Sequence, residues 1–128
     1  MIYLDSSVAL AQLLAEDRFP RAELWQAPLI SSRLLEYEIW TRLHARKLGR
    51  SHGELARAMI GALAFVELAP PVLTRALEPF PVAVRTLDAL HLASMEFLRT
   101  NGQTLELATY DQRLASAATA LNIALAEL

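Results

Sequence analysis

Short, wholly apolar stretches alternate along the chain with longer stretches in which apolar residues recur at helical spacing. The short stretches predict strands at Ile2–Leu4, Pro28–Ser31, Phe65–Leu68, Leu105–Ala108 and Ile123–Ala126. The longer stretches predict helices near Ser6–Ala15, Arg21–Gln26, Arg33–Leu48, His52–Ala64, Val72–Leu77, Leu87–Thr100 and Gln112–Leu121. Apolar strands separated by helices are typical of a parallel sheet covered on both faces. We therefore expect one three-layer α/β/α domain over residues 1–128, with a central parallel sheet of four to five strands.

Glycine and proline divide these elements. Gly49 and the Asn101-Gly102 pair are read as helix stops, and Pro20, Pro70-Pro71, Pro79 and Pro81 as loop residues. The chain contains no linker, repeat or low-complexity tract that would separate domains.

The composition narrows the class of protein. The hydrophobic content of 54% is ample for a core, and the net charge of −2 provides no general basic field for binding nucleic acid. The absence of cysteine excludes disulfides and thiolate metal sites. No apolar run approaches the length of about 18 residues that a membrane span requires. We expect a soluble, cytoplasmic protein without a membrane partner.

Four of the 14 acids have unusual positions. Asp5 directly follows the first strand, and Asp111 lies three residues after the Leu105–Ala108 strand. Because ligands of parallel α/β sheets collect at the carboxyl ends of the strands, both acids fall where a site is expected. Glu38 lies within the apolar stripe of its helix, whereas Glu36 lies at the border of that stripe. Asp88 falls in the first turn of an otherwise apolar helix.

Each acid also has a purely structural interpretation. Asp5 and Asp111 could cap the helices that follow them. Asp88 could be an acid in a first helical turn that the helix dipole stabilises, with Thr86 as the N-cap. Glu38 could pair with Arg42 on the surface.

Together, however, the four acids indicate a cation site. Two carboxylates about 4 Å apart repel by roughly 4 kcal/mol at an effective dielectric constant near 20. Three or four of them in one crevice require a compensating ion. Since these acids provide only oxygen ligands, the ion should be a hard cation, namely Mg²⁺ or Mn²⁺.

The stretches that carry these acids resemble a known family. They are MIYLDSS, SSRLLEYEIWTRL, TLDALHLAS and LATYDQRLASAA, and they span the chain in the order and spacing of PIN-domain ribonucleases, in particular the VapC toxins of bacterial toxin–antitoxin pairs. The combination of TLDALHLAS with TYDQRLASAA is the most specific part of the resemblance.

The resemblance implies a Mg²⁺- or Mn²⁺-dependent ribonuclease that hydrolyses RNA through a metal-activated water. Its catalytic and metal-binding acids would be Asp5, Glu38, Asp88 and Asp111, with Asp111 at the most variable position of the family. Glu38 lies six residues after Ser32, as the family pattern requires. Ser6 and Thr109 would order the site. The resemblance further implies a homodimer and a VapB-like antitoxin whose tail covers the active site.

Binding of RNA would also require positively charged side chains near the acids. Arg42, Arg46, Lys47 and Arg50 lie within nine residues on and after the helix of Glu38, and could bind flanking phosphates or simply be a solvated helix face. His91 is spaced i, i+3 from Asp88, yet its apolar neighbours predict a packed, hydrogen-bonded core histidine. His44 and His52 are expected at the surface.

Two other functional classes are alternatives to a ribonuclease. An aspartyl-phosphate hydrolase or receiver domain needs a lysine beside the acids, and Lys47 is the only lysine. The four isolated glycines form no phosphate-binding loop. A non-catalytic interaction module would tolerate loss of the acids, and metal binding with and without Asp5 separates it from an enzyme.

Overall fold

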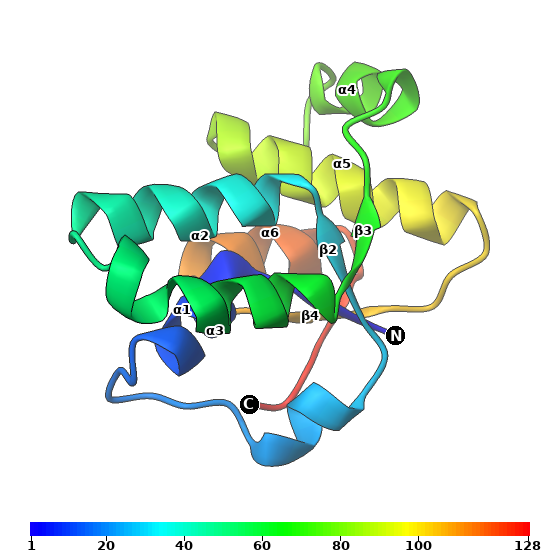
Figure 1. The fold of residues 1–128 in the computed structure, drawn as a ribbon. Coiled ribbons are helices and arrows are strands. Elements are labelled where there is room, and N and C mark those ends of the chain that lie inside the picture. Colours follow the sequence, from blue (N-terminus) through cyan, green and yellow to red (C-terminus); the bar gives the residue numbers. More distant parts are fainter.

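A five-stranded parallel sheet forms the centre of the computed structural model, which describes residues 1–128 (Figure 1). Its strands are β1 (Ile2–Leu4), β2 (Leu29–Ser32), β3 (Ala64–Val66), β4 (Glu106–Ala108) and β5 (Ala124–Leu125). They lie in the order β3-β2-β1-β4-β5, and each neighbouring pair is parallel. The predicted parallel α/β architecture is confirmed.

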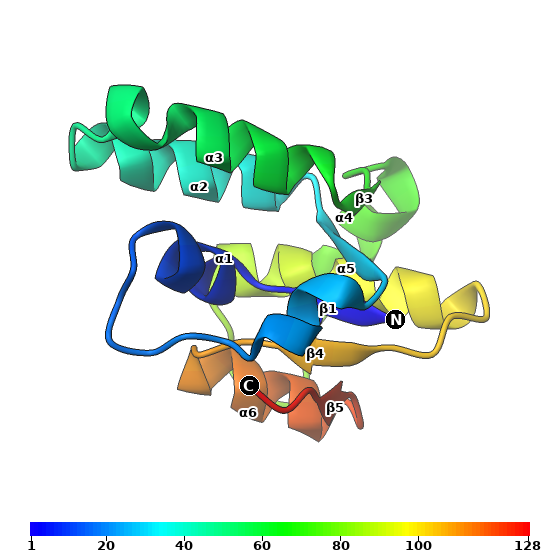
Figure 2. The ribbon, with the colours of Figure 1, turned by 60° about the horizontal axis from the view of Figure 1, so that its bottom comes forward.

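Helices cover both faces of the sheet. They are α1 (Ser6–Leu13), α2 (Leu34–Ala45), α3 (Gly49–Gly61), α4 (Pro70–Ala76), α5 (Thr86–Thr100) and α6 (Gln112–Ala120), with the 3-10 helix η1 (Ala22–Gln26) before β2. One core cluster joins Leu4 to α1, η1, α2 and α3, and a second joins Tyr3 to α4, α5 and α6. Since Tyr3 and Leu4 are adjacent, alternate residues of β1 face opposite layers. Figure 2 shows α2 and α3 on one side of the sheet and α6 on the other. None of these helices is both long and apolar enough to span a membrane.

The boundary between α2 and α3 differs from the prediction. Helix α2 ends at Ala45 rather than Leu48, and Gly49 is the first residue of α3, not a helix stop. The left-handed conformation that ends many helices belongs here to Lys47, with φ of 57°. A lysine gives no signal for this conformation, which explains the misplaced boundary.

The Pro70-Pro71 pair also lies elsewhere than predicted, because it opens α4 rather than lying in a loop. Proline is compatible with a first helical turn, where the backbone N–H it lacks would have no helical partner. The other predicted elements agree with the structure to within a few residues at each end.

The strand order places a crevice at the centre of the sheet. From β1 the chain proceeds to β2 and β3 on one side, and β4 and β5 lie on the other. Leu4 pairs with Ala108 across β1 and β4, and the Asp5 amide donates a hydrogen bond to the Ala108 carbonyl at 3.0 Å. The residues that follow these two strands therefore lie next to each other at the switch point, where open α/β sheets bind ligands.

Candidate active site

All four predicted acids line one pocket of about 290 Å³ at this switch point. Asp5 follows β1, Asp111 precedes α6, Glu38 projects from α2, and Asp88 lies in the first turn of α5. The fold thus brings together carboxylates from four separate stretches of sequence.

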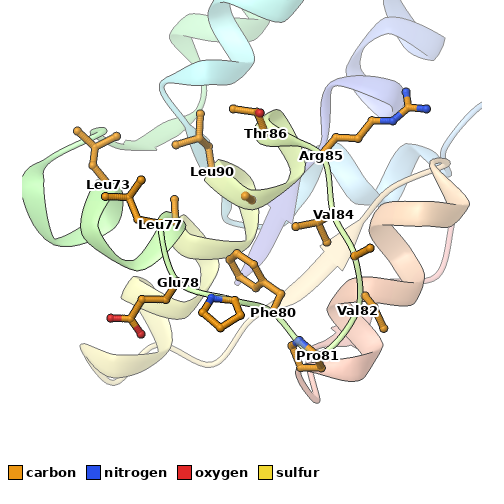
Figure 3. Close-up of a pocket in the computed structure, with 14 residues that line it drawn as sticks. Leu73, Leu77, Glu78, Phe80, Pro81, Val82, Val84, Arg85, Thr86 and Leu90 are labelled. Atoms are coloured by element: carbon orange, nitrogen blue, oxygen red, sulfur yellow. The ribbon is translucent and has the colours of Figure 1, made fainter.

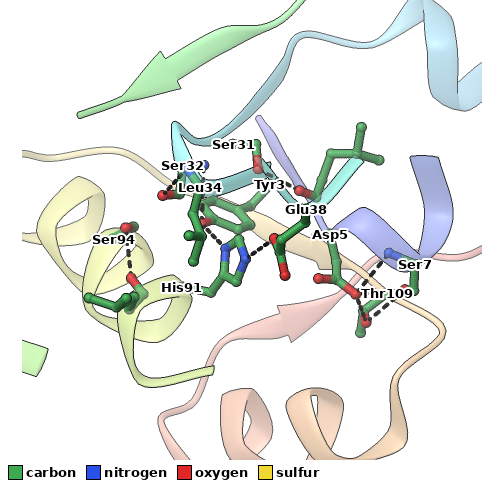
Figure 4. Close-up of polar contacts among 12 residues, drawn as sticks. Tyr3, Asp5, Ser7, Ser31, Ser32, Leu34, Glu38, His91, Ser94 and Thr109 are labelled. Atoms are coloured by element: carbon green, nitrogen blue, oxygen red, sulfur yellow. Dashed lines mark hydrogen bonds and ion pairs between the residues drawn. The ribbon is translucent and has the colours of Figure 1, made fainter. Parts of the chain in front are cut away.

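Asp5 is 5% exposed and is held by hydroxyl groups (Figure 4). Its Oδ2 accepts hydrogen bonds from Ser7 Oγ at 2.6 Å, from Thr109 Oγ1 at 2.8 Å and from the Ser7 amide at 3.3 Å. The Ser7 hydroxyl also accepts from the Tyr110 amide, and the Thr109 hydroxyl accepts from the Asp111 amide, each at 2.9 Å. These bonds tie the end of β1 to the segment after β4 and leave Oδ1 of Asp5 without a protein partner.

The serine that bonds Asp5 is therefore Ser7, whereas Ser6 was the serine expected to order the site. Ser6 lines the pocket but makes no side-chain hydrogen bond. Asp5 is the N-cap of α1, and an N-cap carboxylate receives its bonds two or three residues further along. The spacing of a helix cap would have indicated Ser7. Thr109 occupies the position expected of it, donating to Asp5.

Asp111 caps α6, as its structural interpretation anticipated. Its Oδ1 accepts from the Arg113 amide at 2.9 Å and from the Leu114 amide at 3.3 Å. Asp5 and Asp111 each use a single oxygen to cap a helix. The same residue can therefore cap a helix and present its other oxygen to the pocket.

The pKa of Asp88 is raised by its surroundings in the pocket. Burial raises the pKa of its carboxyl, and the charges of Asp111 and Asp5 raise it further, while His91 acts in the opposite direction. Thr86 is not the cap of this helix; it is the first residue of α5, and Arg85 occupies the N-cap position without a side-chain bond.

Glu38 is held by a buried histidine, not by Arg42. Its Oε1 lies 2.7 Å from His91 Nε2, and the Tyr3 hydroxyl lies 2.7 Å from His91 Nδ1. His91 is 1% exposed, which confirms a packed and hydrogen-bonded core histidine. Burial by itself lowers the pKa of His91, but the hydrogen bond and charge of Glu38, followed by the charges of Asp5 and Asp88, outweigh burial and raise it.

Two arginines line the acidic pocket. Arg42 is one of the four predicted cationic residues, and Arg46, Lys47 and Arg50 lie outside the lining. Arg18 is the other, in the segment between α1 and η1, with its guanidinium 4.5 Å from the centre of the Tyr110 ring. No sequence signal pointed to Arg18, because its place depends on a tertiary contact with a residue 92 positions away.

A larger cavity, of about 740 Å³, lies between α4 and the start of α5 (Figure 3). Its walls are mostly apolar and include Leu73, Leu77 and Phe80, and none of the four acids reaches it. Its lining contains a single carboxylate, Glu78, so it offers no cluster of acids, and it is separate from the candidate site.

The donor set of the acidic pocket fits a hard divalent cation. Every candidate ligand is a carboxylate, and Asp5, Asp111 and Glu38 each keep one oxygen that no protein group bonds. As the side chains stand, no three of these groups converge closely enough to hold one ion. Binding would therefore require some side-chain movement, chiefly of Asp88, because the other three acids are each held through one oxygen.

With this geometry in place, comparison with known proteins identifies the family. The chain matches the PIN domain model over residues 2–120, so it belongs to the PIN-domain family. It is also 32% identical over 126 residues to Ribonuclease VapC46 of Mycobacterium tuberculosis (strain ATCC 25618 / H37Rv), covering 96% of this chain and 94% of that protein. The family resemblance read from the sequence is confirmed.

The pKa of Asp88 makes a prediction for stability. A carboxyl whose pKa is raised on folding binds more protons in the native than in the unfolded state, so its contribution to stability falls as pH rises through the window above 3.8. Asp88→Asn should therefore stabilise the metal-free protein at pH 7, by less than about 1 kcal/mol because the side chain is partly exposed and screened. This gain should shrink as the pH is lowered towards 3.8.

Denaturant unfolding of both proteins in EDTA, between pH 4 and 8, measures this difference. Glu54→Gln is the matched control, because Glu54 is an exposed helical acid outside the pocket. A metal-free Asp88→Asn protein less stable than the parent at pH 7 would show that the carboxylates do not repel one another.

Proposed function

We propose that the protein is a divalent-metal-dependent ribonuclease and the toxin of a toxin–antitoxin pair. The observation that carries the proposal is the convergence of Asp5, Glu38, Asp88 and Asp111 on one pocket at the switch point. Membership of the PIN-domain family and similarity to a protein named Ribonuclease VapC46 support it.

The four carboxylates are the proposed ligands of Mg²⁺ or Mn²⁺. When bound, such an ion would lower the pKa of a water molecule and offset negative charge on a phosphodiester. Of the residues themselves, Ser7 and Thr109 hold Asp5, and the cap bonds hold Asp111. The negatively charged phosphate of the substrate could approach these carboxylates only when a bound cation offsets their charge.

The pocket lining argues against an aspartyl-phosphate enzyme. Such an enzyme needs a lysine beside its acids, but the pocket cations are arginines, and Lys47 lies beyond the end of α2. The arginines also suit RNA better than a lysine would, because guanidinium groups bind phosphates in a bidentate manner.

We infer that Arg18 and Arg42 contact the phosphates nearest the scissile bond. Neither forms an ion pair within the chain, although both line a pocket rich in carboxylates. Arg46, Lys47 and Arg50 would contact phosphates further along the strand, since they lie at the end of α2 and the start of α3.

The remaining partners follow from kinship with VapC proteins. We propose a VapB-like antitoxin encoded with this chain, a homodimer as the active form and a cytoplasmic location. Each can be tested by copurification with the product of the neighbouring open reading frame and by light scattering of the purified protein.

Removing either of two carboxylates should abolish RNA cleavage. We expect Asp88→Asn and Glu38→Gln each to lower kcat by at least about 100-fold, because a metal site that loses a ligand loses most of its activity. The parent should lose activity in EDTA and regain it with Mn²⁺. The assay is cleavage of total RNA, followed by sequencing of the new ends.

Glu36→Gln controls for the loss of an acid from α2. Glu36 lies two residues before Glu38 but pairs with Arg33, at 3.4 Å, outside the pocket. Its variant should cleave at the parent's rate. Cleavage by folded Asp88→Asn at the parent's rate would rule out the proposed mechanism.

The arginines should determine how RNA binding depends on salt. In an Asp88→Asn background, which binds but does not cut, Arg18→Gln and Arg42→Gln should each reduce the slope of log K against log[salt] by about 0.7, as expected for one lost phosphate contact with a single strand. Fluorescence anisotropy with labelled RNA between 50 and 300 mM KCl measures the slope.

The matched comparison is Arg99→Gln. Arg99 lies in the last turn of α5, donates to the Leu121 carbonyl and lies outside the acidic pocket, so its variant should leave the slope unchanged. An unchanged slope in Arg18→Gln would mean that this arginine only packs on Tyr110.

A further inference from the structure

A chain of buried hydrogen bonds runs from the sheet to the acidic pocket. It starts at the Ser32 amide, which donates to the Tyr3 hydroxyl at 3.2 Å, and continues through His91 to Glu38 by two contacts of 2.7 Å. Its members come from β2, β1, α5 and α2, so it joins four elements (Figure 4). Tyr3 and His91 are 0% and 1% exposed.

We propose that His91, anchored by Tyr3, is a positioning residue that fixes Glu38 and leaves one of its oxygens, Oε2, for a divalent cation. The cation rests on the function proposed above, whereas the positioning rests on the contacts of this structure. His91 would act through Glu38 and would touch neither RNA nor the ion.

The direction of the bond to Glu38 follows from its chemistry. A carboxylate only accepts hydrogen bonds, so Nε2 of His91 carries the hydrogen whether the ring is neutral or charged. Oε1 of Glu38 is therefore occupied in either protonation state. Figure 4 shows its second oxygen turned away from the imidazole ring.

The anchoring of His91 also follows from the structure. The Tyr3 and His91 rings meet edge to face, with an interplanar angle of 86° and centroids 5.8 Å apart. Both ring nitrogens are bonded, so the imidazole cannot rotate without breaking a buried hydrogen bond. A histidine held in this way restricts a glutamate side chain that would otherwise sample many rotamers.

Packing alone does not call for a histidine at this place. His91 lies in α5 between Leu90 and Leu92, and both Leu92 and its partner Tyr3 belong to a cluster of buried apolar residues. A buried imidazole is tolerated only when its polar atoms find partners. That one of these partners is a pocket carboxylate indicates that the imidazole serves the site.

The restraint has a consequence for the choice of ion. Asp5 and Asp111 also have one oxygen occupied, so three of the four acids offer a single oxygen each. Single oxygens suit the small octahedral shell of Mg²⁺ or Mn²⁺, whereas Ca²⁺ takes more ligands and accepts bidentate carboxylates. Freeing Glu38 from His91 should therefore weaken the preference for Mn²⁺ over Ca²⁺.

The test measures the affinities of the purified full chain for Mn²⁺ and Ca²⁺ by isothermal titration calorimetry. His91→Leu removes both hydrogen bonds, and Tyr3→Phe removes the anchor with little change in volume. His91→Gln keeps an amide near the position of Nε2. We expect the Kd for Mn²⁺ to rise about 10- to 100-fold in His91→Leu, as for other groups that orient metal ligands.

The other variants refine this expectation. Tyr3→Phe should give an intermediate loss, and His91→Gln should recover part of the affinity that His91→Leu loses. The Kd for Ca²⁺ should change less than that for Mn²⁺. His44→Gln is the matched control, because His44 is exposed and stacks on Trp40 away from the pocket.

Kinetics adds a second readout. His91 borders the acidic pocket but is only 1% exposed, so it offers RNA almost no surface. His91→Gln and Tyr3→Phe should therefore lower kcat and leave KM for RNA unchanged. Excess Mn²⁺ should restore part of kcat, which a global loss of structure would not allow.

Parent-like Mn²⁺ affinity in folded His91→Leu would overturn the proposal. If His91→Leu does not fold, parent-like affinity in both Tyr3→Phe and His91→Gln would overturn it instead. A parent that binds Mn²⁺ in a His91-dependent way but cuts no RNA would contradict the ribonuclease and support the positioning role. A parent that binds no Mn²⁺ would contradict both.

Discussion

Mutual repulsion of carboxylates is the constraint around which this structure is built. Asp5, Glu38, Asp88 and Asp111 line one pocket, and burial, together with the charges of Asp111 and Asp5, raises the pKa of Asp88. The fold holds this arrangement with specific bonds: hydroxyls on Asp5, helix amides on Asp111 and an imidazole on Glu38. Each of these bonds occupies one oxygen and leaves the other free, so the same contacts that hold the acids preserve their capacity to bind a cation.

The sheet topology explains why acids so distant in sequence meet. Because β1 lies between β2 and β4, the segments that leave β1 and β4 open on the same crevice. Helix α2 enters it from β2, and α5 enters from the other layer, bringing Glu38 and Asp88. The second large cavity, beside α4, shares none of this chemistry. The proposed chemistry therefore lies at the switch point and not in the larger cavity beside α4.

The sequence predicted what depends on local pattern. Wholly apolar strands and the acids directly after them located β1, Asp5 and the edge of the sheet, and the helical stripe selected Glu38 over Glu36. It did not predict what depends on tertiary contacts. His91 was expected in the core, yet its partner Glu38 lies 53 residues away, and nothing local encodes that pairing. The same holds for Arg18 on Tyr110, whereas Ser7 was missed although the cap spacing indicates it. The prediction of a helix stop at Gly49 was wrong, because Lys47 adopts the left-handed conformation that usually favours glycine.

The most direct test of the account is the anomalous diffraction signal of Mn²⁺ in crystals of the parent protein. We expect a peak within the pocket, coordinated by oxygens of Asp5, Glu38, Asp88 and Asp111, with Glu38 still bonded to His91. Crystals grown at a Mn²⁺ concentration that supports cleavage, but with no peak among these four side chains, would contradict it.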